Sequence, residues 1–269
     1  CALGSDGSVT CWGYNDDGRA DAPAGSFTAV SAGGRHSCAL RSDGSVTCWG
    51  YNYGGKGDVP AESFTAVAAG EYHFCALRSD GSVTCWGRND DARTDAPAGS
   101  FTAVSAGGRH SCALRSDGSV TCWGYNYEEH DCAAPAPDAL GEDVPCPDRR
   151  DYDGRADAPA GSFTAVSAGR RHSCALRADG SVTCWGYNDD GRADAPAGSF
   201  TAVSAGDRHS CALGSDGSVT CWGDDDDGRA VAPAGSFTAV SAGWDHSCAL
   251  RSDGAVTCWG YRRSYHPPS

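Results

Sequence analysis

Residues 38–50 read Cys-Ala-Leu-Arg-Ser-Asp-Gly-Ser-Val-Thr-Cys-Trp-Gly, and nearly the same thirteen residues recur along the whole chain. The copies begin at Cys1, Cys38, Cys75, Cys112, Cys174, Cys211 and Cys248. Five of the six steps between these cysteines are 37 residues, and the step from Cys112 to Cys174 is 62, which is one period plus 25. A fixed period of about 20–50 residues indicates a repeat architecture, so the sequence says more about fold than about activity.

The repeated stretch predicts a β-hairpin. Val, Thr and Trp favour strands, and the short loop Ser42-Asp43-Gly44 ends in glycine. Such a loop is a type I turn followed by a left-handed residue, and Gly44 tolerates that conformation. Counting outward from the loop places Arg41 opposite Ser45, Leu40 opposite Val46, Ala39 opposite Thr47 and Cys38 opposite Cys48.

This register predicts a disulfide across each hairpin. If Arg41 and Ser45 form a hydrogen-bonded pair, Cys38 and Cys48 fall on a non-hydrogen-bonded pair, where the Cα atoms are about 4.5 Å apart. That spacing lies near the short end of the disulfide range. The alternatives are reduced core thiols or a zinc site, but zinc uses cysteine pairs separated by about two to four residues and these are separated by nine. The predicted pairs are Cys1–Cys11, Cys38–Cys48, Cys75–Cys85, Cys112–Cys122, Cys174–Cys184, Cys211–Cys221 and Cys248–Cys258.

Composition restricts the compartment and the partners. Sixteen cysteines in 269 residues favour an oxidising compartment, so we expect a secreted, cell-surface or periplasmic protein. The net charge of −14 argues against nucleic acid and against an anionic membrane surface. No apolar run approaches the length that spans a membrane. The chain has no methionine and starts within a repeat, so we expect it to be a portion of a longer product.

Each repeat predicts three to four short antiparallel strands and no helix. In the second unit these are Phe27–Gly33, Arg35–Leu40 and Ser45–Trp49, with Asp58–Pro60 as a fourth strand or an irregular edge. A β-solenoid and a β-propeller both suit such units, and seven copies favour the closed propeller. We place Phe27–Gly33 innermost, because small residues suit a crowded axis.

The pattern Val-Ser-Ala-Gly-x-x-His-Ser-Cys-Ala-Leu-x-x-Asp-Gly-x-Val-x-Cys-Trp-Gly resembles the repeat of the RCC1 (regulator of chromosome condensation) family, in particular its cysteine-paired, secreted type. The resemblance covers nearly the whole chain except 127–151 and the tail from about 261. It implies an all-β, seven-bladed β-propeller over residues 1–260, with a 25-residue insertion at 127–151 and a tail or Pro-rich linker at 261–269. Nuclear members bind chromatin and catalyse nucleotide exchange on a small GTPase, but this acidic, cysteine-paired chain lacks a matching insert.

One strand is missing from the count. The hairpin appears seven times, whereas the Phe-Thr-Ala-Val strand appears six times, at Phe27, Phe64, Phe101, Phe163, Phe200 and Phe237. Either residues upstream of Cys1 complete the ring, which we favour, or the first blade lacks its inner strand and presents an edge to another chain.

Several features that repeat in every unit have a structural explanation. The histidines before the cysteines, such as His36, are expected to hydrogen-bond a neighbouring backbone group, and the tryptophans, such as Trp49, to pack between blades. Loops such as Asn15–Asp21 form an acidic rim. These loops make Ca²⁺ the one cofactor that the residues suggest, but they lack the spacing of an EF-hand, and Arg19 partly neutralises the acids, so we expect solvated turns and no cofactor.

Departures from the repeat are better candidates for contact with a partner. The insertion is rich in Glu, Asp, Pro and Ala, so we expect a long loop, closed by a disulfide between Cys132 and Cys146. The alternative is a tolerated surface insertion without function. Other departures are Glu71–Phe74, Asp207-Arg208 and Trp244-Asp245. The candidate partner-binding residues are Tyr127, Glu128, Glu129, His130, Asp131, Tyr53, Lys56, Tyr72, Phe74 and Trp244.

No catalytic motif is present, so we expect no enzyme. We expect a structural or adhesive module of a larger extracellular protein, in contact with other proteins or with copies of itself. The alternative is a carbohydrate-binding propeller with equivalent pockets around the ring, and glycans are then the ligands. Clustering of the departures on one face would favour a protein interface. The ending Pro267-Pro268-Ser269 is consistent with the start of an O-glycosylated stalk.

Overall fold

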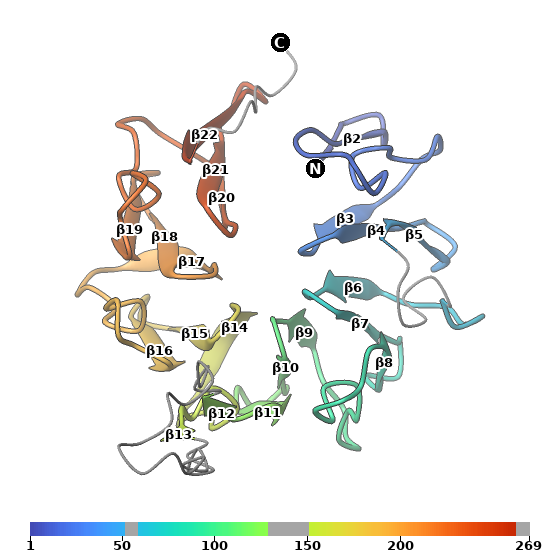
Figure 1. Ribbon diagram of the computed structural model, residues 1–269, viewed down its shortest axis with the longest axis horizontal. Helices are drawn as coiled ribbons and strands as arrows, with labels where there is room; N and C mark the ends of the chain where they lie inside the picture. The colour runs from blue at the N-terminus through green and yellow to red at the C-terminus, as the bar shows by residue number, and fades with distance from the viewer. Residues whose placement is uncertain (52–58, 129–150, 262–269) are drawn as a thin grey trace, which may run out of the picture.

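The chain folds into a ring of small antiparallel sheets in the computed structural model, which describes residues 1–51, 59–128 and 151–261. Six blades have three strands each and the blade at the amino terminus has two, and a further two-stranded sheet lies at the insertion (Figure 1). The described residues contain no helix, and therefore none that could cross a membrane. The prediction of an all-β, seven-bladed propeller is confirmed.

The first blade consists of β1 (Ala2–Leu3) and β2 (Val9–Thr10). The second to fourth blades are β3 (Ala29–Ala32), β4 (His36–Leu40) and β5 (Val46–Gly50); β6 (Ala66–Ala69), β7 (His73–Leu77) and β8 (Val83–Gly87); and β9 (Ala103–Ala106), β10 (His110–Leu114) and β11 (Val120–Gly124). The fifth to seventh blades are β14 (Phe163–Ala168), β15 (His172–Arg177) and β16 (Val182–Gly186); β17 (Phe200–Ala205), β18 (His209–Gly214) and β19 (Val219–Gly223); and β20 (Ala239–Ala242), β21 (His246–Leu250) and β22 (Val256–Gly260).

The hairpin register follows the prediction. Cys38 pairs with Cys48 and Leu40 with Val46, while the N–H of Arg41 donates to the carbonyl of Ser45 at 2.9 Å. Gly44 has a φ of 84°, as the turn requires. Each hairpin carries its predicted disulfide, with Cα atoms 3.9–4.0 Å apart. The pair Cys132–Cys146 lies outside the described residues.

The small-residue strands lie innermost, as predicted. The inner strands β3, β6, β9, β14, β17 and β20 surround the axis, and each of the first five packs against the inner strand of the next blade (Figure 1). A Cβ on Gly33 would lie 2.0 Å from the carbonyl oxygen of Gly70 in the next blade, so only glycine fits there. Crowding at the axis therefore explains the Ala-Ser-Gly composition of these strands.

Large apolar side chains fill the spaces between blades. Trp123 of the fourth blade packs with Cys75 and Leu77 of the third, and Trp259 of the seventh packs with Cys211 and Leu213 of the sixth. This confirms the predicted position of the tryptophans. Each blade covers the apolar side of its neighbour, so the core is a series of equivalent layers rather than one central cluster.

The repeated histidines also join blades, but their partner differs from the prediction. Nε2 of His73 lies 2.7 Å from Oγ of Ser111, and Nε2 of His172 lies 2.6 Å from Oγ of Ser210. In both cases the partner is a serine hydroxyl of the next blade rather than a backbone group. Sequence spacing does not show this, because the two residues are 38 positions apart.

Candidate functional site

The two ends of the strands form two different faces of the propeller. One face carries the Ser-Asp-Gly turns of the hairpins. The other carries the residue that follows the Ala-Gly at the end of each inner strand, and we call these six residues the inner ring: Gly34, Glu71, Gly108, Arg170, Asp207 and Trp244. We call the face that carries them the inner-ring face.

Backbone hydrogen bonds hold the inner ring together from blade to blade. The N–H of Glu71 donates to the carbonyl of Gly107 at 3.1 Å, and the N–H of Arg170 donates to that of Gly206 at 3.0 Å. Equivalent bonds start from the N–H groups of Gly34, Gly108 and Asp207. The side chains of this ring are therefore displayed from a rigid frame around the axis.

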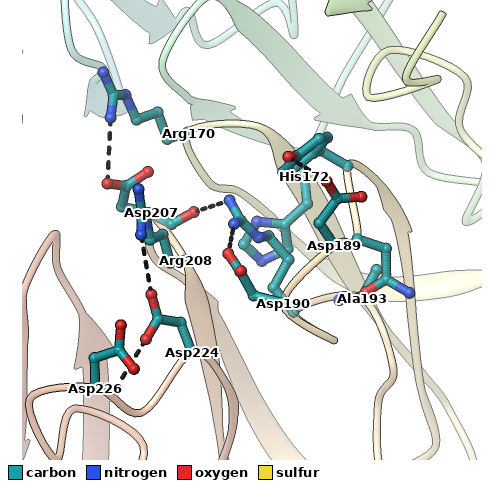
Figure 2. Close-up of polar contacts among 12 residues, drawn as sticks. Arg170, His172, Asp189, Asp190, Ala193, Asp207, Arg208, Asp224 and Asp226 are labelled. Carbon is teal, nitrogen blue, oxygen red and sulfur yellow. Dashed lines mark hydrogen bonds and ion pairs between the residues drawn. The ribbon is translucent and has the colours of Figure 1, made fainter.

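Charged inner-ring residues converge although they come from three blades. Nε of Arg170 lies 3.2 Å from Oε2 of Glu71, and Nη1 of Arg170 lies 3.3 Å from Oδ2 of Asp207 (Figure 2 shows the second pair). Both carboxylates are buried. Burial raises the pKa of Asp207 against the opposing effect of Arg170. Burial lowers the pKa of Arg170, but Asp207 and Glu71 outweigh it, so the net shift is upward.

Trp244 completes this cluster with an exposed aromatic surface. Its side chain lies against Gly34, and the guanidinium of Arg170 lies over its ring at 5.2 Å from the centroid. It is 39% exposed, which makes it one of the few large apolar side chains open to solvent in the described chain. A rigid, partly exposed tryptophan beside an arginine is typical of the centre of a protein-binding surface.

Arginine and tyrosine alternate in a second circle outside the inner ring. The guanidinium groups of Arg109 and Arg155 both lie over the ring of Tyr125, each 5.3 Å from its centroid. Arg171 and Arg192 lie over Tyr187 at 5.3 and 4.9 Å. These tyrosines are therefore occupied by cations rather than presented as platforms for sugar rings.

The Asp-rich loops lie outside this circle on the same face. In each loop that the structure describes, an aspartate contacts an arginine, which is buried except at Arg19, where it is 22% exposed. Asp190 contacts Arg192, and Nη1 of Arg192 donates to the carbonyl of Asp207 at 2.9 Å (Figure 2). Equivalent loop pairs are Asp17–Arg19, Asp91–Arg93, Asp153–Arg155 and Asp227–Arg229. Within the described residues, no group of three or more His, Cys, Asp or Glu side chains is placed to hold a metal ion.

The insertion leaves the propeller on this face as well. It starts with a short hairpin of β12 (Tyr127–Glu128) and β13 (Asp151–Tyr152), between Asn126 and Asp153 of an Asp-rich loop. Asn126 keeps the role of its counterparts, because its side chain bonds to Asp157 and to the N–H of Ala156. The predicted contact residues Glu129, His130 and Asp131, like Tyr53, Lys56 and the tail, lie outside the described residues.

Of the other predicted contact residues, Tyr72 and Trp244 lie on the inner-ring face. Phe74 does not, and that prediction is wrong. Its side chain is 0% exposed, and its ring stacks on Trp86 at 5.4 Å and lies 4.1 Å from His36. Phe74 occupies the position of the inter-blade serine, so this departure from the repeat belongs to the core.

Sequence reasoning missed Arg170, Arg171 and Arg109, which the structure brings together with Tyr72 around one pocket. The available signal was that Arg170 stands where the second and fourth units have Gly34 and Gly108. This signal is weak, because arginine occurs one position later in several other units, as at Arg35 and Arg109.

Comparisons with known proteins agree with this architecture. Six segments match the Regulator of chromosome condensation (RCC1) repeat, at residues 27–56, 64–92, 101–129, 163–192, 200–229 and 237–263. No curated protein sequence matches the chain significantly.

Among solved structures, the ectodomain of the receptor kinase CR4 from Physcomitrella patens is 25% identical, with a TM-score of 0.75 over 95% of this chain and 68% of that one. The CRINKLY WD40 ectodomain of the receptor kinase ACR4 from Arabidopsis thaliana is 26% identical, with a TM-score of 0.72 over 95% of this chain and 88% of that one. Yeast RCC1 (Prp20), in a structure with Kap60, is 20% identical, with a TM-score of 0.67 over 87% of this chain and 70% of that one, and it shows the shared fold. Because the repeat matches cover more than half of its residues, this chain belongs to the RCC1 repeat family.

Proposed function

We propose that this protein is an extracellular binding module that contacts other proteins through its inner-ring face. The observation that carries the proposal is the convergence of the non-repeat residues on that face. Glu71, Arg170, Asp207 and Trp244 meet around the axis, and the hairpin of the insertion leaves the same face. Single changes also occur at the hairpin-turn end, such as Gly214 at the position of Arg41 and Ala178 at that of Ser42. At the inner-ring end the changes bring charged and aromatic side chains into contact, as a surface for a single partner would require.

Two further observations support an extracellular module. Seven disulfides staple the hairpins, which is typical of proteins in oxidising compartments. Two similar propellers are ectodomains of receptor kinases. A structural or adhesive role in a cell-surface or matrix assembly is the specific form of this function that we favour.

Blocking substitutions on the two faces test the proposal. Asp226 lies in a loop on the inner-ring face and Ser252 in the hairpin turn on the opposite face, and both belong to exposed segments. We would immobilise the wild type, Asp226→Trp, Trp244→Ser and Ser252→Trp, and identify proteins that each retains from the extracellular fraction of the source.

The expected result is a protein that the wild type and Ser252→Trp retain and that Asp226→Trp and Trp244→Ser do not. Equal retention by all four proteins would contradict the choice of face. Retention of glycans, with no protein that distinguishes the variants, would favour the carbohydrate-binding alternative instead.

A further inference from the structure

The junction between the seventh and first blades, which are neighbours in the ring, is built differently from the others (Figure 1). The regular arrangement is seen one junction earlier, where the seventh blade covers Cys211 and Leu213 of the sixth. The covering residues are Phe237, Val240 and Ala242 of the inner-strand segment and Ala249 and Trp259 of the hairpin. The first blade has the hairpin counterparts, Ala2 and Trp12, but among the described residues it has no inner-strand segment to cover the seventh.

The seventh blade is therefore exposed on the side that faces the first. Leu250 is 37% exposed, whereas its counterpart Leu213 is 6% exposed. Cys248 is half-buried, whereas Cys211 is 0% exposed. Apolar surface that the second to sixth blades bury thus remains open at one junction. We call this junction the seam and define it by Ala2, Trp12, Ser241, Cys248 and Leu250.

The strand β1 presents an unpaired backbone edge beside the seam. In the second blade, β4 pairs with β5 on one side and with β3 on the other. In the described chain β1 pairs only with β2, through Leu3 and Val9 and through Ala2 and Thr10. Leu3 is 38% exposed, whereas its counterpart Leu40 is 5% exposed. Such an edge is a template for one further strand.

Two polar groups of the seventh blade are placed to bond to that further strand. In the sixth blade, Oγ of Ser204 accepts from the N–H of Ala242 at 2.9 Å, and the N–H of Asp207 donates to the carbonyl of Gly243 at 3.0 Å. Both partners belong to the inner strand of the next blade. The equivalent groups of the seventh blade are the Ser241 hydroxyl and the Trp244 N–H, and neither forms such a bond within the described residues.

The regular junctions define the chemistry of the strand that fits. A phenylalanine opens each of the six inner-strand segments, and these six side chains are only 3–8% exposed. A glycine closes each segment because the axis is crowded. A Cβ on Gly206 would lie 2.5 Å from the carbonyl oxygen of Gly243 in the next blade. At Gly243 itself, the atoms nearest to such a Cβ belong to its own blade.

We propose that the seam binds an extended segment of a partner protein, which adds to β1 as a third strand. The segment has an aromatic residue, then small residues and finally a glycine. In strand addition, backbone hydrogen bonds supply affinity and side-chain pockets supply specificity. Here the aromatic ring covers Leu250 and Cys248, and the glycine passes the axis. This contact goes beyond the proposed function, because it uses a strand edge rather than the side chains of the inner ring.

Binding of a labelled peptide tests the inference. The probe is fluorescein-labelled Ser-Phe-Thr-Ala-Val-Ser-Ala-Gly-Gly, the sequence of residues 26–34, and fluorescence anisotropy should show saturable binding to the wild type. One control peptide replaces the phenylalanine by serine, and another replaces the first glycine by valine. Each should bind at least about tenfold more weakly, because the first leaves the seam uncovered and the second places a side chain at the crowded axis. Valine favours strands, so equal or tighter binding of the valine peptide would indicate unspecific strand pairing and overturn the inference.

A charge in the seam should block the peptide. Leu250→Glu should weaken binding at least about tenfold, because the aromatic ring would bury the carboxylate. Val231→Glu is the matched control, since Val231 is 61% exposed in the loop before β20, where other units carry Asp21 and Asp194. It should change the affinity by less than about twofold. Equal effects of the two substitutions would place the peptide outside the seam.

A lengthened chain keeps the test decisive even if Leu250→Glu does not fold. In this chain, a copy of residues 27–37 precedes Cys1, so that the first hairpin follows an inner-strand segment as the second does. The added strand should occupy the seam and abolish binding of the peptide. Undiminished binding by the lengthened chain would contradict the proposed site.

Light scattering at rising concentration separates a partner segment from a second copy of this chain. A wild type that stays monomeric and binds the peptide supports the inference. Self-association of the wild type that the lengthened chain loses would show that a second copy occupies the seam, and it would overturn the choice of occupant.

Discussion

Nε of Arg170 lies 3.2 Å from Oε2 of Glu71, although the two residues are 99 positions apart and belong to different blades. The contact joins the fifth blade to the third on the inner-ring face. Arg170 also reaches Asp207 of the sixth blade at 3.3 Å. One side chain thus links three blades, and it does so on the face where the repeats differ most.

Replacing Arg170 by methionine should lower the free energy of unfolding at pH 7 by about 1–2 kcal/mol. Buried carboxylates that lose their cation are strongly destabilising, and we reduce the expected loss because the Arg170 side chain is 40% exposed. Urea unfolding measures the effect. Arg208→Met is the matched control. Its effect should stay below about 0.5 kcal/mol, because Arg208 is 54% exposed and Asp224 keeps the hydrogen bond from the N–H of Asp226. Equal losses in both variants would contradict this account.

Replacing Phe74 by serine restores the residue of the other repeats but should destabilise the protein by about 2–4 kcal/mol. Removing a buried phenylalanine costs about 3–5 kcal/mol, and a new bond from His36 to the serine returns about 1 kcal/mol. Urea unfolding measures the loss, while partner retention should not change. An unchanged stability would mean that the repeat serine is as good a fit between these blades.

Stability should fall as the pH decreases from about 6.5 to 5. Burial lowers the pKa of His172 to about 3 and, together with Arg229, that of His209 to about 4, whereas histidines of the unfolded chain titrate near 6.5. In this window the unfolded state binds protons that the folded state excludes. Each such histidine therefore removes about 1.4 kcal/mol per pH unit.

Urea titrations at several pH values measure this slope. His172→Gln should reduce the slope of the unfolding free energy against pH by the contribution of one histidine, about 1.4 kcal/mol per pH unit. Exposed turn carboxylates such as Asp43 have lowered pKa values because Ser45 donates to them, so they act only at more acidic pH. A slope that His172→Gln leaves unchanged would show that this histidine is protonated in the folded protein.

Removing Ca²⁺ with EDTA should shift Tm by less than about 2 °C, which corresponds to less than about 1 kcal/mol. The reason is that Asp190 and its counterparts contact the arginine of their own loop. Differential scanning calorimetry checks this. A saturable increase of Tm with Ca²⁺, abolished by Asp190→Asn, would instead show a calcium site.

The sequence predicted the parts of this structure that recur. The turn at Gly44 fixed the register of Cys38 and Cys48, and the period set the number of blades, because both depend on local geometry. It did not predict that Arg170 contacts Glu71. The two residues are 99 positions apart, and they meet only because the blades close into a ring. It also misplaced Phe74, because an aromatic departure from a repeat has the same appearance in the sequence whether it faces solvent or a neighbouring blade.

Photo-crosslinking in the native source tests most directly the central claim that the inner-ring face binds another protein. A photoreactive amino acid at position 226, between the sixth and seventh blades, samples the inner-ring face, and the same group at position 252, in the hairpin turn of the seventh blade, samples the opposite face. We predict a discrete crosslinked protein from position 226, competed by the unlabelled wild type, and none from position 252. Crosslinks from position 252 alone would place the binding surface on the face of the hairpin turns and contradict the account.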